Sequence, residues 1–367
     1  MVTETQTTYA PPPVPRPLED GWTLPASWYS EPAVLELERA RIFTSAWQYA
    51  GPAEHVTEPG SYFASVAGHI PVVVTRARDG ELRGFVNVCR HRGHVVAEGA
   101  GCRATLQCPY HAWTYGLDGR LRRAPRSERE PGFDASSLSL LPLSVDTWGP
   151  FVFVNPDPGA GPLLDALGPL PQLVARSGLD LDSLRHHSHV PWEQEVNWKV
   201  ALENYLECYH CPVAHPGLSK VVDVSADAYR LEEHGMVASQ YGNPRDPDAF
   251  ADTTVTRAQY HLMFPATTFN VELGPMNLSV DASLPGSDPG ASLGFADFYA
   301  PAEVGDQELG ELMAFADQVG KEDEALVEGV REGLESGLVP QGRLITSSEH
   351  QIAWFQRLVF EALSSRG

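Results

Sequence analysis

Two short loops, each holding one cysteine and one histidine, constrain this 367-residue chain more than any other feature. The first loop reads Cys89-x-His91 and the second reads Cys108-x-x-His111. Brought together, they offer two thiolates and two imidazoles, a set that suits a tetrahedral zinc ion or a [2Fe–2S] cluster. Structural zinc sites commonly use separate cysteine and histidine pairs, whereas each loop here is mixed. Mixed loops favour a cluster in which the cysteines hold one iron and the histidines hold the other.

A second group of candidate ligands follows in the C-terminal half. Apolar spacing predicts a helix over residues 197–211, which Pro212 would end. Glu207 and His210 fall at its end, and His215 comes soon after the proline, so it can fold back toward His210. Two histidines with one carboxylate form the facial triad of non-haem iron sites, so a carboxylate from elsewhere is required.

The carboxylate has a candidate on a long amphipathic helix predicted over residues 306–336. Asp323 falls near the middle of its apolar stripe. An unpaired carboxylate on such a face costs several kcal/mol, roughly, and a metal ion would relieve that cost. Two plainer readings stay open from the residues alone: a solvated polar face around His210, and a carboxylate hydrogen-bonded in a cleft at Asp323.

Charge and cysteine count exclude several classes of protein. The net charge of −22 predicts no nucleic acid partner and no membrane partner, because phosphate backbones and anionic lipids would be repelled. The N-terminus does not resemble a signal peptide, which predicts a cytoplasmic protein. Five cysteines, an odd number, argue against a disulfide framework, and Cys102 is expected to be a small core residue. The chain lacks a dinucleotide fingerprint, so NAD(P)H would act only indirectly.

The two mixed loops, with Arg92-Gly93 and Ala112-Trp113-x-Tyr115 beside them, resemble the cluster motif of Rieske proteins. Residues 203–210 with His215, and Glu322-Asp323 on the late helix, resemble the catalytic domain of Rieske non-haem iron oxygenases. The resemblance implies an α+β protein. It would have an N-terminal arm and helix (1–44), an all-β Rieske domain (45–157) and a catalytic domain with a helix-flanked antiparallel sheet (158–367).

The resemblance also implies the cofactors and the residues that serve them. One Rieske [2Fe–2S] cluster would be bound by Cys89, His91, Cys108 and His111, and one mononuclear Fe(II) by His210, His215 and Asp323. Asn204 would shape the pocket near this iron. Glu207 would join His210 to His111 of the partner subunit, which implies a homotrimer. A separate reductase, with or without a ferredoxin, would supply the electrons.

One residue that differs from the usual family pattern indicates the substrate class. Most relatives carry Asp where this chain carries Glu207, and the glutamate resembles the branch that acts on betaine-like quaternary ammonium compounds. The expected function is a terminal oxygenase that uses O₂ to hydroxylate or N-demethylate such a substrate. An aromatic-ring hydroxylating mono- or dioxygenase is the alternative, and a Rieske electron carrier is a third. A cationic substrate needs aromatic rings around it, and the candidates are Tyr260, Phe264, Phe269 and Phe298.

Overall fold

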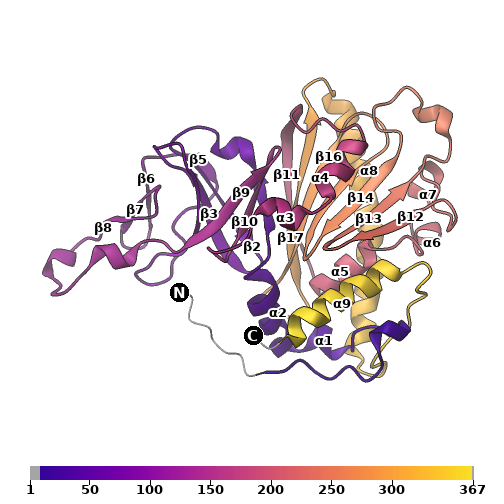
Figure 1. The fold of residues 1–367 in the computed structure, drawn as a ribbon, viewed down its shortest axis with the longest axis horizontal. Coiled ribbons are helices and arrows are strands. Elements are labelled where there is room, and N and C mark those ends of the chain that lie inside the picture. Colours follow the sequence, from indigo (N-terminus) through magenta and orange to yellow (C-terminus); the bar gives the residue numbers. More distant parts are fainter. Residues whose placement is uncertain (1–8, 366–367) are drawn as a thin grey trace. The chain divides into compact units, whose positions relative to one another are not determined.

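The structure is a computed structural model, and it describes residues 9–365. The chain forms two compact units. One comprises residues 43–166, and the other joins residues 9–42 with residues 167–365. The first eight residues of the expected N-terminal arm lie outside the described part. Figure 1 shows the elements of both units.

The 43–166 unit is built almost entirely from short antiparallel strands. Its larger sheet has the order β1-β10-β9-β4-β3-β2-β5, and its smaller sheet has the order β6-β7-β8. The strands are β1 (Gln48–Pro52), β2 (Ser61–Ala67), β3 (Ile70–Arg76), β4 (Leu82–Val86), β5 (Ala100–Cys102), β6 (Thr105–Gln107), β7 (Thr114–Gly116), β8 (Leu121–Arg123), β9 (Pro142–Trp148) and β10 (Phe151–Asn155). This all-β architecture holds two loops, one between β4 and β5 and one between β6 and β7.

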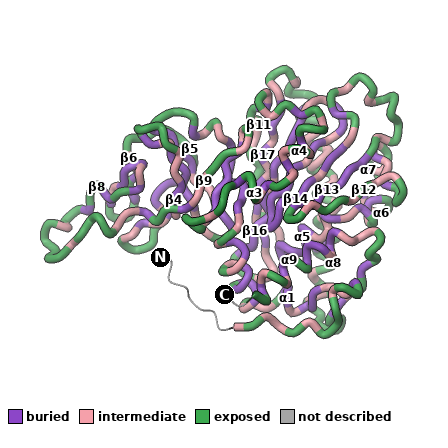
Figure 2. Tube along the Cα trace, viewed as in Figure 1, coloured by how far each residue is buried: buried purple, intermediate pink, exposed green. Residues whose placement is uncertain are grey.

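A buried cluster of aromatic and aliphatic side chains supports these two loops. Tyr62, Phe85 and Tyr115 belong to it, as do both loop cysteines. The turn between β7 and β8 requires a glycine, since Gly119 has a φ of +77° and a Cβ there would lie 2.4 Å from the Phe85 ring. The buried stretches in Figure 2 show this interior.

The second unit is organised around one seven-stranded antiparallel sheet of order β11-β17-β16-β15-β14-β13-β12. Its strands are β11 (Leu184–Gln194), β12 (Arg230–His234), β13 (Val237–Gly242), β14 (Ala258–Met263), β15 (Thr267–Val271), β16 (Leu278–Pro285) and β17 (Ser292–Pro301). This is the helix-flanked antiparallel sheet that was expected for the catalytic half.

Helices pack around this sheet (Figure 1). They are α1 (Ser27–Ser30), α2 (Pro32–Glu38), α4 (Leu170–Arg176), α5 (Trp198–Tyr205), α6 (Cys211–Ala214), α7 (Leu218–Val221), α8 (Asp306–Glu335) and α9 (His350–Ser364). A further helix, α3 (Leu163–Leu167), begins in the 43–166 unit and ends at the first residue of the second unit's C-terminal segment. Helix α2 is tied to α5 by a fully buried ion pair between Glu38 and Lys199, and Trp198 Nε1 donates to the same carboxylate at 2.8 Å. This pair anchors the N-terminal segment in the second unit.

The predicted helix over residues 197–211 is wrong at its C-terminal end. Helix α5 stops at Tyr205, and Pro212 lies inside the next short helix, α6, rather than ending the first. The Glu207 side chain accepts hydrogen bonds from the backbone N–H groups of Tyr209 and His210, which holds this segment as a turn. The ligand candidates therefore sit between two helices rather than on one helical face.

Candidate metal centres and substrate cavity

The two mixed loops meet in the 43–166 unit. Cys89 and Cys108 are buried and their side chains interact, whereas His91 and His111 are exposed. The imidazole centroids are 4.6 Å apart at an angle of 78°. The structure thus brings together all four predicted ligands, with both sulfurs inside and both imidazoles at the surface.

Neighbouring groups prepare these side chains for a metal. The hydroxyl of Tyr115 lies 3.4 Å from Cys89 Sγ, and the Trp113 ring stacks on His91 at 4.9 Å. Burial raises the pKa of the Cys108 thiol, so the thiolate needs positive charge nearby. Loss of hydration, with the charge of His91, lowers the pKa of His111, which favours the neutral imidazole that binds metals. The separation of sulfurs from imidazoles fits a cluster with two differently bound irons.

A second centre forms in the other unit. His215 Nε2 lies 3.0 Å from His210 Nε2 and 3.0 Å from Asp323 Oδ1, and His210 Nε2 lies 3.5 Å from the same oxygen. Donors bound about 2.1 Å from one ion at right angles stand about 3.0 Å apart. The three atoms are therefore spaced as a facial triad requires, and the donor set of two imidazoles and one carboxylate fits iron.

Each of the three donors is held by a further side chain. Glu207 contacts Nδ1 of His210, and Glu322 Oε2 lies 2.9 Å from Nδ1 of His215. Asn204 Nδ2 donates to Asp323 Oδ1 at 2.7 Å. Such partners fix ring orientation and raise the basicity of the ligand.

The electrostatics of this centre favour a bound cation. Burial opposes a charge on His210, yet hydrogen bonds to Asp323 and Glu207 raise its pKa to about 9. Burial alone would raise the pKa of Asp323, but hydrogen bonds from His210, His215 and Asn204 lower it to about 2. The carboxylates therefore place an excess of negative charge around the two imidazoles. A bound metal cation would neutralise this charge in place of protons.

Helix α8 carries Asp323 much as its sequence predicted, although its apolar stripe is less buried than expected. Leu309 and Val327 are buried, whereas Leu326 and Val330 are exposed in the single chain. Glu322, the adjacent acid, was not recognised as a partner of His215. The only sequence signal for that role was its position next to Asp323 on the same helix.

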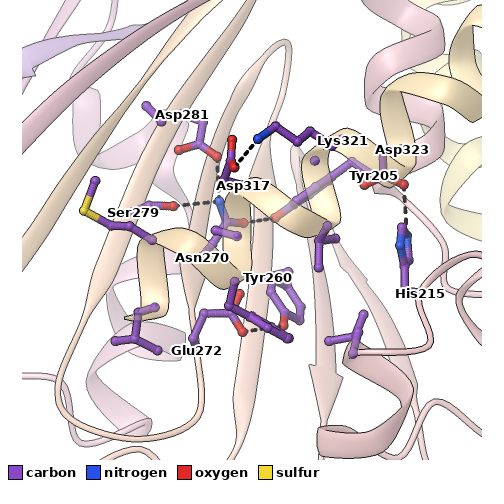
Figure 3. Close-up of a pocket in the computed structure, with 18 of the residues that line it drawn as sticks. Tyr205, His215, Tyr260, Asn270, Glu272, Ser279, Asp281, Asp317, Lys321 and Asp323 are labelled. Atoms are coloured by element: carbon purple, nitrogen blue, oxygen red, sulfur yellow. Dashed lines mark hydrogen bonds and ion pairs between the residues drawn. The ribbon is translucent and has the colours of Figure 1, made fainter. Parts of the chain in front are cut away.

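A cavity of about 750 Å³ opens beside this centre. Its lining includes Asn204, Glu207, His210, His215 and Asp323, so the predicted iron ligands and the two predicted residues beside them border one space. Figure 3 shows His215 and Asp323 facing each other at one side of the cavity, while side chains from the sheet form another side.

Two of the four aromatic candidates line this cavity and two do not. Tyr260 and Phe298 border it. Phe269 is fully buried on the other face of β15, where it pairs with His261. Phe264 packs near Phe355, with ring centroids 6.0 Å apart.

Two predictions about cysteines are wrong. Cys102 is exposed on β5 rather than in the core, because all of this short edge strand is exposed. Cys208 and Cys211 form a disulfide, which the sequence did not predict. The turn after α5 brings their Cα atoms to 4.9 Å, within bridging range.

In the described part of the chain, no helix is long and apolar enough to cross a bilayer.

Comparison with known proteins assigns both units to families. Residues 46–143 match the Rieske [2Fe-2S] domain, and residues 181–365 match the catalytic domain of the ring hydroxylating alpha subunit. The carnitine monooxygenase oxygenase subunit of Acinetobacter pittii is 35% identical over 92% of this chain and 94% of its own length. The chloroplastic choline monooxygenase of Beta vulgaris is 33% identical over 95% of this chain and 78% of its own length.

Solved structures agree with this assignment. A crystal structure of the quaternary ammonium Rieske monooxygenase CntA has a TM-score of 0.84 at 34% identity, covering 95% of this chain and 98% of CntA. Naphthalene 1,2-dioxygenase shares the fold, with a TM-score of 0.76 at 17% identity. The match to a catalytic domain rules out a pure electron carrier. The chain belongs to the Rieske-type ring-hydroxylating oxygenase alpha subunits, iron-dependent oxidoreductases whose cofactors are a Rieske [2Fe–2S] cluster and a mononuclear iron.

Proposed function

We propose that this chain is the terminal oxygenase of a system that oxidises a small quaternary ammonium compound with O₂. The reaction would take one O₂, two electrons and two protons, insert one oxygen atom into a substrate C–H bond, and release the other as water. The observation that carries the proposal is the triad of His210, His215 and Asp323 at the wall of a cavity that also presents aromatic rings and carboxyl groups. Relatives named for carnitine and choline support this substrate class.

The residues divide between two centres. We assign Cys89 and Cys108 to one iron of the cluster, and His91 and His111 to the other. We assign His210, His215 and Asp323 to the mononuclear iron, which supplies the activation of O₂ when bound. These residues would lie in a Rieske domain at 45–157 and a catalytic domain at 158–367, after an N-terminal arm and helix at 1–44.

The remaining side chains of the catalytic centre hold the ligands in place. Asn204 orients the Asp323 carboxylate through its 2.7 Å hydrogen bond, and Glu322 holds the tautomer of His215. Glu207 keeps Nδ1 of His210 oriented from the side away from the triad. The cavity wall positions the substrate and excludes water from the reacting carbon.

We also infer how electrons reach this centre. Glu207 contacts His210 and would accept a second contact from His111 of the partner subunit, in a homotrimer. The exposed position of His91 and His111 suits an intersubunit contact, and a CntA structure is described in terms of inter-subunit electron transfer. A separate reductase, with or without a ferredoxin, would deliver electrons from NAD(P)H in the cytoplasm.

An aromatic-ring hydroxylase on the same scaffold is less well supported. The likeness to naphthalene 1,2-dioxygenase concerns the fold alone. An apolar aromatic substrate would cover the carboxyl groups of the cavity wall without neutralising their charge. The free-energy cost of removing them from water would therefore remain.

Subunit complementation tests the function and the electron route together. His91→Ala should abolish the cluster and Asp323→Ala should abolish the mononuclear site, so neither variant oxidises choline alone. Co-expressed variants should recover a fraction of the wild-type rate, since an intact cluster then faces an intact iron site in the next subunit. No recovery, with each variant keeping its unaltered metal centre, would contradict transfer between subunits. Absence of choline oxidation by the wild-type protein and its reductase would count against this substrate.

A further inference from the structure

One row of side chains crosses the sheet and forms the wall of the cavity. The ladder pairs Gln240 with Tyr260, Tyr260 with Asn270, Asn270 with Ser279, and Ser279 with Phe298. Directly paired residues point to the same face of a sheet, and all five line the cavity. The strands β13 to β17 therefore present one continuous surface to the substrate.

Two carboxyl groups extend this surface. Asp281 stands two residues after Ser279 on β16, and Glu272 stands two residues after Asn270, just past the end of β15. Alternation along a strand keeps positions two apart on one face, and both side chains border the cavity. Figure 3 shows Asp281 and Glu272 on the sheet side, away from His215 and Asp323.

Both carboxyl groups have only neutral hydrogen-bond donors among the described residues. Asp281 Oδ2 accepts from Asn270 Nδ2 at 2.8 Å, while its Oδ1 is buried and has no partner. Glu272 Oε2 accepts from the Tyr260 hydroxyl at 2.9 Å. Within residues 9–365, Lys321 is the one lysine or arginine that lines the cavity, and its ammonium already pairs with Asp317 at 2.6 Å.

These half-buried carboxylates lack the positive charge that would stabilise them. Burial raises the pKa of Asp281 to about 7 and that of Glu272 to about 7, and repulsion from Asp281 adds to the raised pKa of Glu272. A quaternary ammonium group cannot donate a hydrogen bond, but it neutralises charge and packs on aromatic faces. Tyr260 and Tyr205 are two aromatic residues of the cavity lining, and their hydroxyls are bonded to Glu272 and Asn270.

We propose that Asp281 and Glu272 form the cation subsite of this cavity and select quaternary ammonium substrates that carry no carboxylate. This inference rests on the proposed function and narrows its substrate class. Choline, whose other end is a neutral hydroxyl, fits such a site. L-carnitine and γ-butyrobetaine add a carboxylate, which the acids that line the cavity would repel. A cation held at the sheet side leaves the uncharged end of the substrate directed toward the triad.

Steady-state kinetics of the holoenzyme with its reductase test this proposal. Wild type should oxidise choline with a kcat/KM at least tenfold above that for γ-butyrobetaine. Asp281→Asn and Glu272→Gln should each raise the choline KM about tenfold or more, since each removes a carboxylate near the cation, while kcat changes less. Use of γ-butyrobetaine should fall less, because weaker repulsion of its carboxylate offsets part of the attraction lost at its cation, so the preference for choline should shrink. Asp252→Asn removes the same charge from an exposed site outside the cavity and serves as the matched control.

Two results would overturn the inference: a wild-type preference for γ-butyrobetaine, or equal losses for both substrates in the two variants. Calorimetric titration of choline into the anaerobic protein separates this failure from failure of the proposed function. If choline binds to wild type and binds at least tenfold more weakly to Asp281→Asn, the subsite stands even without turnover. If choline does not bind to wild type, the subsite is wrong.

Discussion

The carboxyl group of Asp281 should make the protein less stable as the pH rises, which is opposite to the usual behaviour of an aspartate. Burial raises its pKa from 3.8 to about 7 in the folded chain. The folded state therefore keeps this proton at a pH where the unfolded state has lost it. Because the folded state binds more protons, its stability falls with rising pH between roughly 4 and 7.

The size of this effect follows from the pKa values of the folded and unfolded states. A pKa difference of one corresponds to about 1.4 kcal/mol, so ionising Asp281 costs the folded state at most about 4 kcal/mol near pH 8. Near pH 4.5 the cost is only about 1 kcal/mol, because the group is then protonated in the folded state and partly protonated in the unfolded state. Asp281→Asn removes this penalty, so its stability advantage over wild type should grow by about 3 kcal/mol across that range.

Urea unfolding of both proteins, followed by tryptophan fluorescence near pH 4.5 and near pH 8, measures this difference. The exposed Asp252→Asn variant should track wild type at both values. The reasoning is refuted if the difference in unfolding free energy between wild type and Asp281→Asn is the same at both pH values. Such a result would mean that the carboxylate is well solvated or already neutralised. If Asp281→Asn is more stable than wild type but binds choline poorly, then Asp281 lowers the stability of the protein while it promotes binding of the cation.

Three further variants probe other parts of the account. Glu207→Gln, with both metals retained, should lower kcat about 10- to 100-fold at unchanged choline KM, and a full oxidation rate would contradict the bridge. Asn204→Ala removes the hydrogen bond to Asp323 and should weaken iron binding about 10- to 100-fold, measured as iron retained against a chelator. Lys199→Met leaves Glu38 as a buried unpaired charge and should cost about 3 to 5 kcal/mol in urea unfolding. Adding Glu38→Leu should restore most of that loss, and no restoration would contradict a simple pairing role.

The side chains predicted as metal ligands lie together in two groups in the structure, and short local motifs made this juxtaposition predictable. Cys89 and His91 lie in one loop, and His210 and His215 are separated by a single short helix, so local geometry alone limits where each pair can point. Asp323 was predicted as a ligand because an unpaired carboxylate on the apolar face of a helix is costly, and a metal ion would relieve that cost.

Features that depend on distant pairing were not predicted. Asp281 and Glu272 face the same cavity only because β15 and β16 pair in one register, and a one-residue shift of either strand would turn its own carboxyl group away. The end of α5 was misplaced because Glu207 was treated as a residue of the helix face, whereas it caps the following turn. The Cys208–Cys211 bridge depends on that same turn.

Single turnover of the reduced protein tests the central claim most directly. The holoprotein, reduced chemically under argon, would be mixed with choline and O₂, and oxidised choline would be counted per mononuclear iron. The account predicts close to one product per iron, with both metal centres oxidised afterwards and no product from Asp323→Ala. Oxidation of both centres without product from choline, γ-butyrobetaine or L-carnitine would contradict a quaternary ammonium oxygenase.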